Sequence, residues 1–319
     1  MKVTFWGTRG SLPAPLSAAT IREKIAVALI RAAGRDLGTP DAARAFVDHE
    51  LTFPESSTYG GNSSCVQIET GGPEYLICDL GSGARELAVN AIARHGPGAP
   101  QTYNVLMSHL HWDHIMGFPL FVPAYIPGNR IRIHGCHAAL EQAFRAQNSA
   151  PSFPVEFDDL RATIEFVTLE PDRPYAIAGF TVTPTKQYHG GDSYGYRIEK
   201  DGKTVVYTTD AEHKLDQPVD IERFVNFFRD ADLVIFDAMY SFAEAASVKE
   251  DWGHSSNVVG LELCQAAGAR HLVLFHHEPV YDDHRIHQIF QETLRLEEIT
   301  RRGHPVKISA AYDGLVVDL

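Results

Sequence analysis

The chain has 319 residues, of which 44% are hydrophobic, and its 28 basic and 41 acidic residues give a net charge of −13. This composition excludes a disordered chain, and the acidic balance argues against a broad nucleic-acid-binding face, which needs a basic surface. It still allows one small anionic substrate to bind at a local positive centre.

Chain length and local apolar runs narrow the class of protein. A chain of this length buries roughly 75% of its unfolded surface, so neither disulfides nor metal ions are needed for folding alone. No apolar run approaches the roughly 18 residues of a membrane helix, and residues 1–6 begin a strand rather than a signal peptide. The cysteines form no C-x-x-C pair (Cys65, Cys78, Cys136, Cys264). We therefore expect a cytoplasmic protein with buried free thiols and no membrane partner.

Strand patterns alternate with helical patterns through the first half of the chain. Short runs bounded by Gly, Pro or Asn predict strands over residues 3–7, 65–69, 75–79, 103–107 and 131–134. Helices are expected over residues 85–94, which His95-Gly96-Pro97-Gly98 ends, and over residues 138–146.

Residues 14–58 interrupt this alternation, between the opening strand and Tyr59-Gly60-Gly61-Asn62. They predict two helices, over residues 21–33 and 41–50, and Thr39-Pro40-Asp41 supplies a cap and a first-turn proline for the second. We interpret this segment as a helical insertion. Two roles remain open for it: a surface helical hairpin, or a lid or dimer element over the functional site.

The second half of the chain is richer in strands. Strands are expected over residues 180–186, 194–199, 204–209, 233–236, 271–275, 306–309 and 315–317, and helices over 255–267 and 285–301. Asp201-Gly202 between two of these strands is a strong hairpin signal. Two strand-rich halves with interspersed helices predict an α/β protein of stacked sheets with helices outside.

The dominant chemical signal is His109-Leu110-His111-Trp112-Asp113-His114, which follows the strand predicted over residues 103–107. In an extended segment, residues two apart point the same way, so His109 and His111 can converge on one metal ion. If a helical turn begins next, Asp113 and His114 turn towards a second position. Imidazole nitrogen and carboxylate oxygen are ligands that zinc readily accepts.

Two metal ions need more ligands than this segment supplies, and three further candidates follow predicted strands: His189, Asp210 and His276. Apolar strands deliver side chains to a sheet edge, a common place for a site on a rigid scaffold. The completed prediction places His109, His111 and His189 on one metal ion, Asp113, His114 and His276 on the other, and Asp210 between them.

With these motifs the chain resembles the metallo-β-lactamase-fold hydrolases, over nearly its whole length except residues 14–58. The family's first motif, an Asp after a strand, matches Asp79 in Cys78-Asp79-Leu80-Gly81-Ser82-Gly83. The resemblance implies that Asp79 supports the metal loop without binding metal. It also implies a single domain over residues 1–319, an αββα four-layer sandwich with a dimetal site at one edge of the two sheets.

Details of the motifs separate branches of that superfamily. Flavodiiron oxidoreductases carry Glu at the position of His111, and the lactamases themselves carry Cys or Ser at the position of Asp210, so both activities are disfavoured. Four runs resemble the ribonuclease Z and cyclic-nucleotide phosphodiesterase branch: Gly7-Thr8-Arg9-Gly10-Ser11, Tyr59-Gly60-Gly61-Asn62-Ser63-Ser64, residues 189–199, and Gly253-His254-Ser255-Ser256. This resemblance implies that His254 assists the leaving group.

Ribonuclease Z is the main rival within this branch. Its tRNA-gripping arm is inserted between the positions of His189 and Asp210, where this chain has only one predicted hairpin. The acidic chain also lacks an obvious handle for long RNA. The run Phe275-His276-His277-Glu278-Pro279, followed by Asp282-Asp283, looks more like the small-phosphodiester branch.

These inferences together predict a dimetal phosphodiesterase for small phosphodiesters, above all 3′,5′-cyclic nucleotides. The expected cofactors are two divalent metal ions, zinc or else manganese, with a bridging hydroxide that attacks phosphorus. Asp113 and Asp210 are the expected catalytic carboxylates, and His254 is the expected general acid. Family resemblance also implies a homodimer.

Three alternatives stay open: an RNA or tRNA 3′-endonuclease like ribonuclease Z, a carbon-ester or lactone hydrolase of the same fold, and a non-catalytic binding protein. Two more histidines have open roles. His277 is expected to pack or to support the ligands, with substrate contact as the alternative. His213 is expected to be exposed to solvent, with contact to phosphate or sugar as the alternative.

Overall fold

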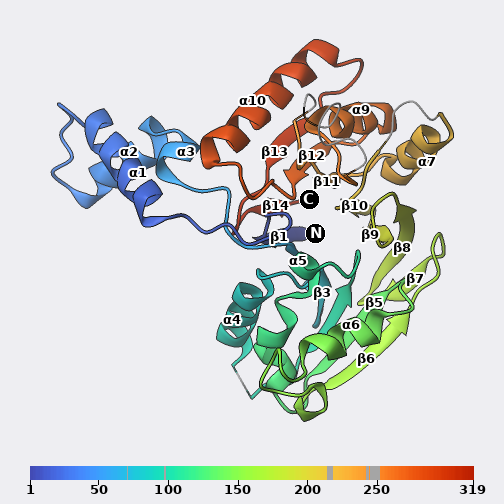
Figure 1. The fold of residues 1–319 in the computed structure, drawn as a ribbon. Coiled ribbons are helices and arrows are strands. Elements are labelled where there is room, and N and C mark those ends of the chain that lie inside the picture. Colours follow the sequence, from blue (N-terminus) through green and yellow to red (C-terminus); the bar gives the residue numbers. More distant parts are fainter. Residues whose placement is uncertain (70, 97, 214–217, 242–243, 245–251) are drawn as a thin grey trace.

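The computed structural model describes residues 1–69, 71–96, 98–213, 218–241, 244 and 252–319, and within them the chain forms two mixed seven-stranded sheets (Figure 1). The first has the order β14-β1-β2-β3-β4-β5-β6. Its strands are β1 (Lys2–Gly7), β2 (Cys65–Glu69), β3 (Glu74–Cys78), β4 (Thr102–Leu106), β5 (Arg130–Gly135), β6 (Thr163–Thr168) and β14 (Val316–Asp318). From β3 to β6 the neighbours are parallel, whereas β14, β1, β2 and β3 pair antiparallel.

The second sheet repeats this division, in the order β13-β12-β11-β10-β9-β8-β7. Its strands are β7 (Tyr175–Ile177), β8 (Phe180–Gln187), β9 (Ser193–Lys200), β10 (Lys203–Thr208), β11 (Leu233–Asp237), β12 (His271–Phe275) and β13 (Lys307–Ala310). From β10 to β13 the neighbours are parallel, and β7 to β10 pair antiparallel. The turn between β9 and β10 places Asp201 and Gly202 at positive φ, as the Asp-Gly signal predicts.

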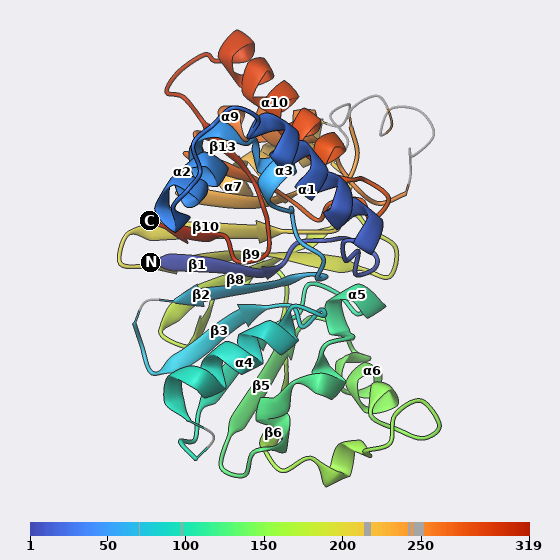
Figure 2. The same cartoon turned by 90° about the vertical axis from the view of Figure 1, so that its left-hand side faces the viewer.

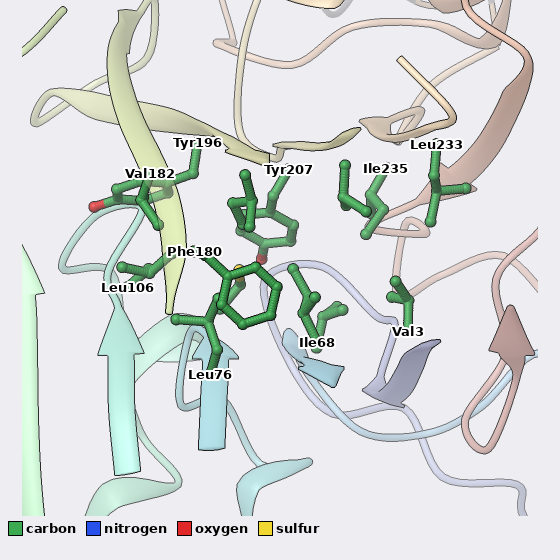
Figure 3. Packing of buried hydrophobic residues seen from close by; sticks show 14 of the residues in the cluster. Val3, Ile68, Leu76, Leu106, Phe180, Val182, Tyr196, Tyr207, Leu233 and Ile235 are labelled. Atoms are coloured by element: carbon green, nitrogen blue, oxygen red, sulfur yellow. The ribbon is translucent and has the colours of Figure 1, made fainter. Parts of the chain in front are cut away.

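A hydrophobic core fills the space between the sheets (Figure 3). Val3, Ile68 and Leu106 of the first sheet meet Val182 and Tyr207 of the second, and all five are essentially inaccessible to solvent. Helices cover both outer faces (Figure 2). On the first sheet they are α4 (Ala84–His95), α5 (Trp112–Ile115) and α6 (Leu140–Gln147); on the second they are α7 (Pro218–Phe228), α9 (Asn257–Ala267) and α10 (Asp283–Thr300). The predicted αββα sandwich is confirmed.

The segment expected to be an insertion forms α1 (Ala18–Arg31), α2 (Pro40–Glu50) and the short α3 (Phe53–Ser56). These helices stand beside α10, outside the four layers (Figure 1). Ser17 caps the first helix, which begins three residues earlier than expected; Thr39 caps the second and Pro40 begins it, as predicted. None of the residues of α1 is buried.

The cysteines and the hydropathy of the helices agree with the sequence pattern. All four cysteines are free; three are buried and Cys136 is half-buried. Among the residues that the structure describes, no helix combines the length and the apolar character needed to cross a bilayer.

Candidate metal centre

The predicted metal ligands lie just beyond the carboxyl ends of strands from both sheets. His109 follows β4, and His189, Asp210 and His276 follow β8, β10 and β12. Because β10, β11 and β12 are parallel, their carboxyl ends share one edge of the second sheet. This is the edge where open α/β sheets bind ligands.

A short helix separates the two halves of the histidine motif. His111 is extended, with φ −67° and ψ 155°, and it caps α5, which carries Asp113 and His114. The change from extended to helical backbone lets His109 and His111 point one way while the next two side chains turn elsewhere. The helical turn expected after His111 is therefore present.

The first group of candidate ligands is His109, His111 and His189, each with a ring nitrogen within 4.8 Å of the others. The His189 Nε2 atom lies 3.2 Å from His111 Nδ1. The His109 ring is buried, whereas His111 is exposed and His189 half-buried. This group faces solvent on the His111 side.

The second group is Asp113, His114, Asp210 and His276, and all four side chains are buried. Asp113 Oδ2 lies 3.1 Å from His114 Nε2 and 3.2 Å from His276 Nε2. The two imidazole Nε2 atoms are themselves 3.3 Å apart. Four ligand atoms thus converge on one small volume away from solvent.

Asp210 stands between the two groups. Its Oδ1 atom is 3.1 Å from His114 Nε2 and 3.2 Å from His276 Nε2. Its Oδ2 atom faces the first group, 3.6 Å from His109 Nε2 and 3.7 Å from His189 Nε2. One carboxylate therefore presents one oxygen to each group, which is the arrangement expected of a bridging ligand.

The candidate ligand atoms are better satisfied by divalent cations than by hydrogen bonds to one another. Facing imidazole nitrogens, as in the His114–His276 and His111–His189 pairs, share at most one proton. The buried His109 Nε2 atom has no hydrogen-bond partner among the described residues. Converging imidazole lone pairs and carboxylate oxygens form a donor set suited to zinc, and manganese accepts such ligands as well.

Asp79, which follows β3, forms hydrogen bonds that support the segment carrying the candidate ligands. Its Oδ2 atom accepts hydrogen bonds of 2.7 Å from His114 Nδ1, Ser108 Oγ and Tyr207 Oη, and its Oδ1 atom accepts one from Ser108 N at 2.8 Å. The bond from His114 Nδ1 fixes the ring tautomer, so that Nε2 is left for the centre. The Gly253 carbonyl fixes His189 in the same way, at 2.8 Å from Nδ1.

His254 lies beside the centre and pairs with Asp237. The His254 Nδ1 atom donates to Asp237 Oδ2 at 2.8 Å and lies 4.0 Å from Asp210 Oδ2. Its ring stacks on that of His276, with 5.3 Å between centroids. Burial alone would lower the pKa of His254, but the Asp237 carboxylate raises it to about 9.

Burial and neighbouring charges set the protonation states in the centre. Burial lowers the pKa of His109 well below its ordinary value. Burial alone would raise the pKa of Asp210, but the imidazoles of His276 and His114 lower it well below that of a free carboxyl. Burial also opposes protonation of His114, whose pKa Asp113 and Asp210 nevertheless raise well above its ordinary value. A metal ion bound at His114 must therefore displace a proton.

The backbone is strained where the strands end in the centre. Asp79, Asp210 and His276 all have positive φ, between 47° and 60°, which is uncommon for residues other than glycine. Gly10 packs directly on the His276 ring, because a Cβ atom at this position would lie 2.7 Å from it. Strained residues and a close glycine contact together fix the direction of the ligands.

Two histidines outside the centre are placed clearly. The expectation that His213 is exposed is wrong: it is buried, with its ring stacked on Phe236 and edge-on to Phe224. Burial lowers its pKa to about 4. The sequence does not indicate this burial, because His213 follows the end of a strand, next to polar residues. His277 Nε2 donates to the Ala311 carbonyl at 2.9 Å and the side chain is buried, in agreement with a packing role.

Three residues that contact the centre or its support were missed in the sequence. Asp237 ends β11 just as Asp210 and His276 follow β10 and β12, so the same strand-end pattern could have identified it. Ser108 and Tyr207 carry no such signal. Tyr207 reaches Asp79 from the opposite sheet, and that contact depends on how the sheets stack.

Comparison with known proteins places this geometry in a family. The description "Beta-lactamase superfamily domain" matches residues 78–277, more than half of the chain. Ribonuclease Z from Haloarcula marismortui is 24% identical over 263 residues, which cover 67% of this chain and 80% of that protein.

Solved structures agree in fold. The metallo-β-lactamase fold protein YhfI from Bacillus subtilis superposes with a TM-score of 0.64 at 20% identity, covering 99% of this chain and 98% of its own. Unliganded yeast PDE1 gives a TM-score of 0.65 at 14% identity, covering 100% and 99%. The match over residues 78–277 contains all of the predicted ligands. This chain belongs to the β-lactamase superfamily and is a metal-dependent hydrolase of the metallo-β-lactamase fold.

Proposed function

We propose that this protein hydrolyses small phosphodiesters, and 3′,5′-cyclic nucleotides in particular, at a pair of divalent metal ions. The position of Asp210 carries the proposal, because its two oxygens face two separate groups of ligands. Named relatives and structural neighbours include ribonuclease Z and yeast PDE1, which favours phosphodiesters over carbon esters.

The ligand set follows from the two groups. We assign His109, His111 and His189 to one ion, Asp113, His114 and His276 to the other, and Asp210 to both, with zinc as the first choice of metal. When bound, two such ions lower the pKa of a water molecule, orient a phosphate oxygen and spread the charge that develops during in-line attack.

We assign the proton donor for the leaving group to His254, which lies beside the proposed metal ligands. The Asp237 carboxylate holds His254 through Nδ1, at 2.8 Å, and favours the protonated ring. With Nδ1 occupied, the Nε2–H group is the one free to donate to a departing alkoxide. General acid help of this kind is worth about 10²–10⁴-fold in rate.

The short connection between two ligands supports a small substrate. Between His189 and Asp210 the chain forms only β9 and β10, joined by a tight turn, and every residue of this interval is described. This interval therefore contains no arm that could hold a tRNA. The net charge of −13 likewise favours a small anion over a long RNA.

Hydrolysis of cyclic nucleotides tests the proposal directly. Protein loaded with zinc or manganese is incubated with cyclic AMP, GMP, CMP and UMP, and with a precursor tRNA, and products are separated by chromatography. We expect a linear nucleotide from at least one cyclic substrate, and loss of that product with a chelator. Cleavage of the tRNA with inert cyclic nucleotides would instead assign a ribonuclease Z activity, and release of acid from acyl substrates alone would assign an esterase.

We also propose a homodimer that uses the exposed face of α1. Ile21, Ile25 and Leu29, one helical turn apart, are 46%, 55% and 68% exposed. Helices in proteins gain most of their stability from the packing of an apolar face, and α1 buries none of its residues. The same stripe on a second copy of the chain offers a complementary apolar surface.

A further inference from the structure

One exposed aromatic residue lies next to a candidate ligand in the sequence, and its side chain makes no ring contact or hydrogen bond with the described residues. Trp112 lies between His111 and Asp113 in the sequence, and its side chain is 76% exposed. Tryptophan is ordinarily well buried, because its large ring loses most by contact with water. Trp6 behaves in that ordinary way: it packs against the core, and its Nε1–H group donates to Gln67 Oε1 at 3.0 Å.

Trp112 marks the open side of the centre. Of the seven assigned ligands, His111 is exposed and His189 half-buried, while the others are buried. A substrate therefore reaches the centre past His111. Trp112 is the residue after His111, with Cα atoms about 3.8 Å apart, and it is exposed like His111, so it adjoins this entrance.

The other exposed aromatic residue next to a ligand, Tyr188, is already engaged. It precedes His189 and is 48% exposed, but its hydroxyl donates to Asp220 Oδ1 at 2.9 Å and its ring lies edge-on to Phe224. Trp112 has no ring neighbour of this kind among the described residues. Its exposed indole face can therefore receive a flat ligand.

We propose that Trp112 stacks on the base of a nucleotide whose phosphate lies at the metal centre. This inference rests on the proposed phosphodiesterase function and identifies the substrate class as one that carries an aromatic base. The ligands are all polar, so the phosphate occupies the centre and the base must lie outside it, at the entrance. Stacking on an aromatic side chain contributes about 1–3 kcal/mol per base and tolerates any base.

Binding of a product and of its base-free analogue tests the proposal. Titration calorimetry of the zinc-loaded protein measures Kd for adenosine 5′-monophosphate and for ribose 5-phosphate, which share the phosphate and the sugar. Trp112→Ala should raise Kd for the nucleotide roughly 5- to 150-fold, equivalent to the stacking energy, and leave Kd for ribose 5-phosphate unchanged. Trp112→Phe should retain most of the nucleotide affinity.

Leu120→Ala provides a matched control, because Leu120 is 59% exposed in the segment that follows α5 but adjoins no ligand. It should change neither Kd. Equal effects of Trp112→Ala on both ligands, or no effect on either, would overturn the stacking, as would a wild-type protein that binds both ligands equally. The same wild-type protein is assayed on cyclic AMP. Absence of hydrolysis with base-dependent binding would reject the cyclic-nucleotide reaction and leave the stacking standing.

Discussion

The metal centre and the helical insertion differ most in how firmly each holds its side chains. In the centre, Asp79 accepts four hydrogen bonds, from Ser108, His114 and Tyr207, and Asp210 and His276 have positive φ where they follow β10 and β12. In the insertion, α1 buries no residue. The side chains of the centre are therefore fixed by their surroundings, whereas the side chains of α1 remain exposed or half-buried.

The contacts of the insertion show where it is attached. Lys24 of α1 forms an ion pair of 2.8 Å with Asp283, the first residue of α10, and donates to the Ser57 carbonyl at 2.9 Å. Phe53 of α3 lies against Tyr59 and Tyr312, with ring centroids 4.6 and 5.0 Å away. Changes near these anchors should affect stability, and changes beyond them should affect only interactions with partners.

The largest effect is expected at Asp210. Asp210→Asn removes the charge shared by both groups of ligands, so the protein should lose most of its bound metal and all measurable hydrolysis while remaining folded. Elemental analysis and circular dichroism check this. Asp201→Asn, in the exposed turn between β9 and β10, is the control. If the Asp210 variant kept its full metal content, Asp210 would not be a bridging ligand. The contrast between the fixed metal centre and the exposed insertion would then be weaker.

Asp79→Asn should have the next largest effect. It leaves every assigned ligand in place but removes the carboxylate that orients His114. Partners of metal ligands typically contribute 10–100-fold to metal affinity, and a loss of about that size is expected here. Competition with a fluorescent zinc chelator measures it. Unchanged affinity would show that the His114 ring is oriented without Asp79.

Asp237→Asn should change the pH dependence of hydrolysis. Burial opposes protonation of His254, and Asp237 overcomes this effect and raises its pKa to about 9. A general acid works below its pKa, so activity should fall as pH rises through that value, and the variant should lose activity at lower pH than the wild type. Rate profiles of both proteins measure the shift. Coincident profiles would exclude His254 as the acid.

The α1 stripe should affect assembly without affecting chemistry. Leu29→Lys places a charge on a side chain that is 68% exposed, and such surface changes usually alter stability by less than about 0.5 kcal/mol. We expect the variant to become monomeric in light scattering, with kcat retained. Glu23→Lys, on another face of the same helix, serves as the matched charge control. A Leu29 variant with unchanged mass would retire the proposed interface.

The smallest effect is expected within the insertion, at Glu55. The Thr52 backbone N–H lowers the pKa of this carboxyl below 4.5, against the opposing effect of burial. Its contribution is therefore present above that value and lost as pH falls through the lowered pKa. Glu55→Gln should cost about 1 kcal/mol or less at neutral pH and nothing in acid, as measured by denaturant unfolding. A cost that persists in acid would point to packing.

The sequence alone predicted the candidate ligands but not the residues that support them, for physical reasons. Ligands such as His109 and Asp210 follow apolar strands of regular pattern, so their convergence could be inferred from strand ends. Tyr207 and Ser108 could not be found, because their contacts with Asp79 depend on the stacking of two sheets. His213 was placed in solvent because its aromatic neighbours, Phe224 and Phe236, lie on other elements.

The proposed ligands come from both halves of the sandwich: His109, His111, Asp113 and His114 from the first, and His189, Asp210 and His276 from the second. A cation held there also acts as a cross-link, since the halves cannot slide past one another without releasing it. Any species bound only by the native state shifts unfolding in proportion to the logarithm of its concentration. Resistance to heat in this protein should therefore rise with metal supply.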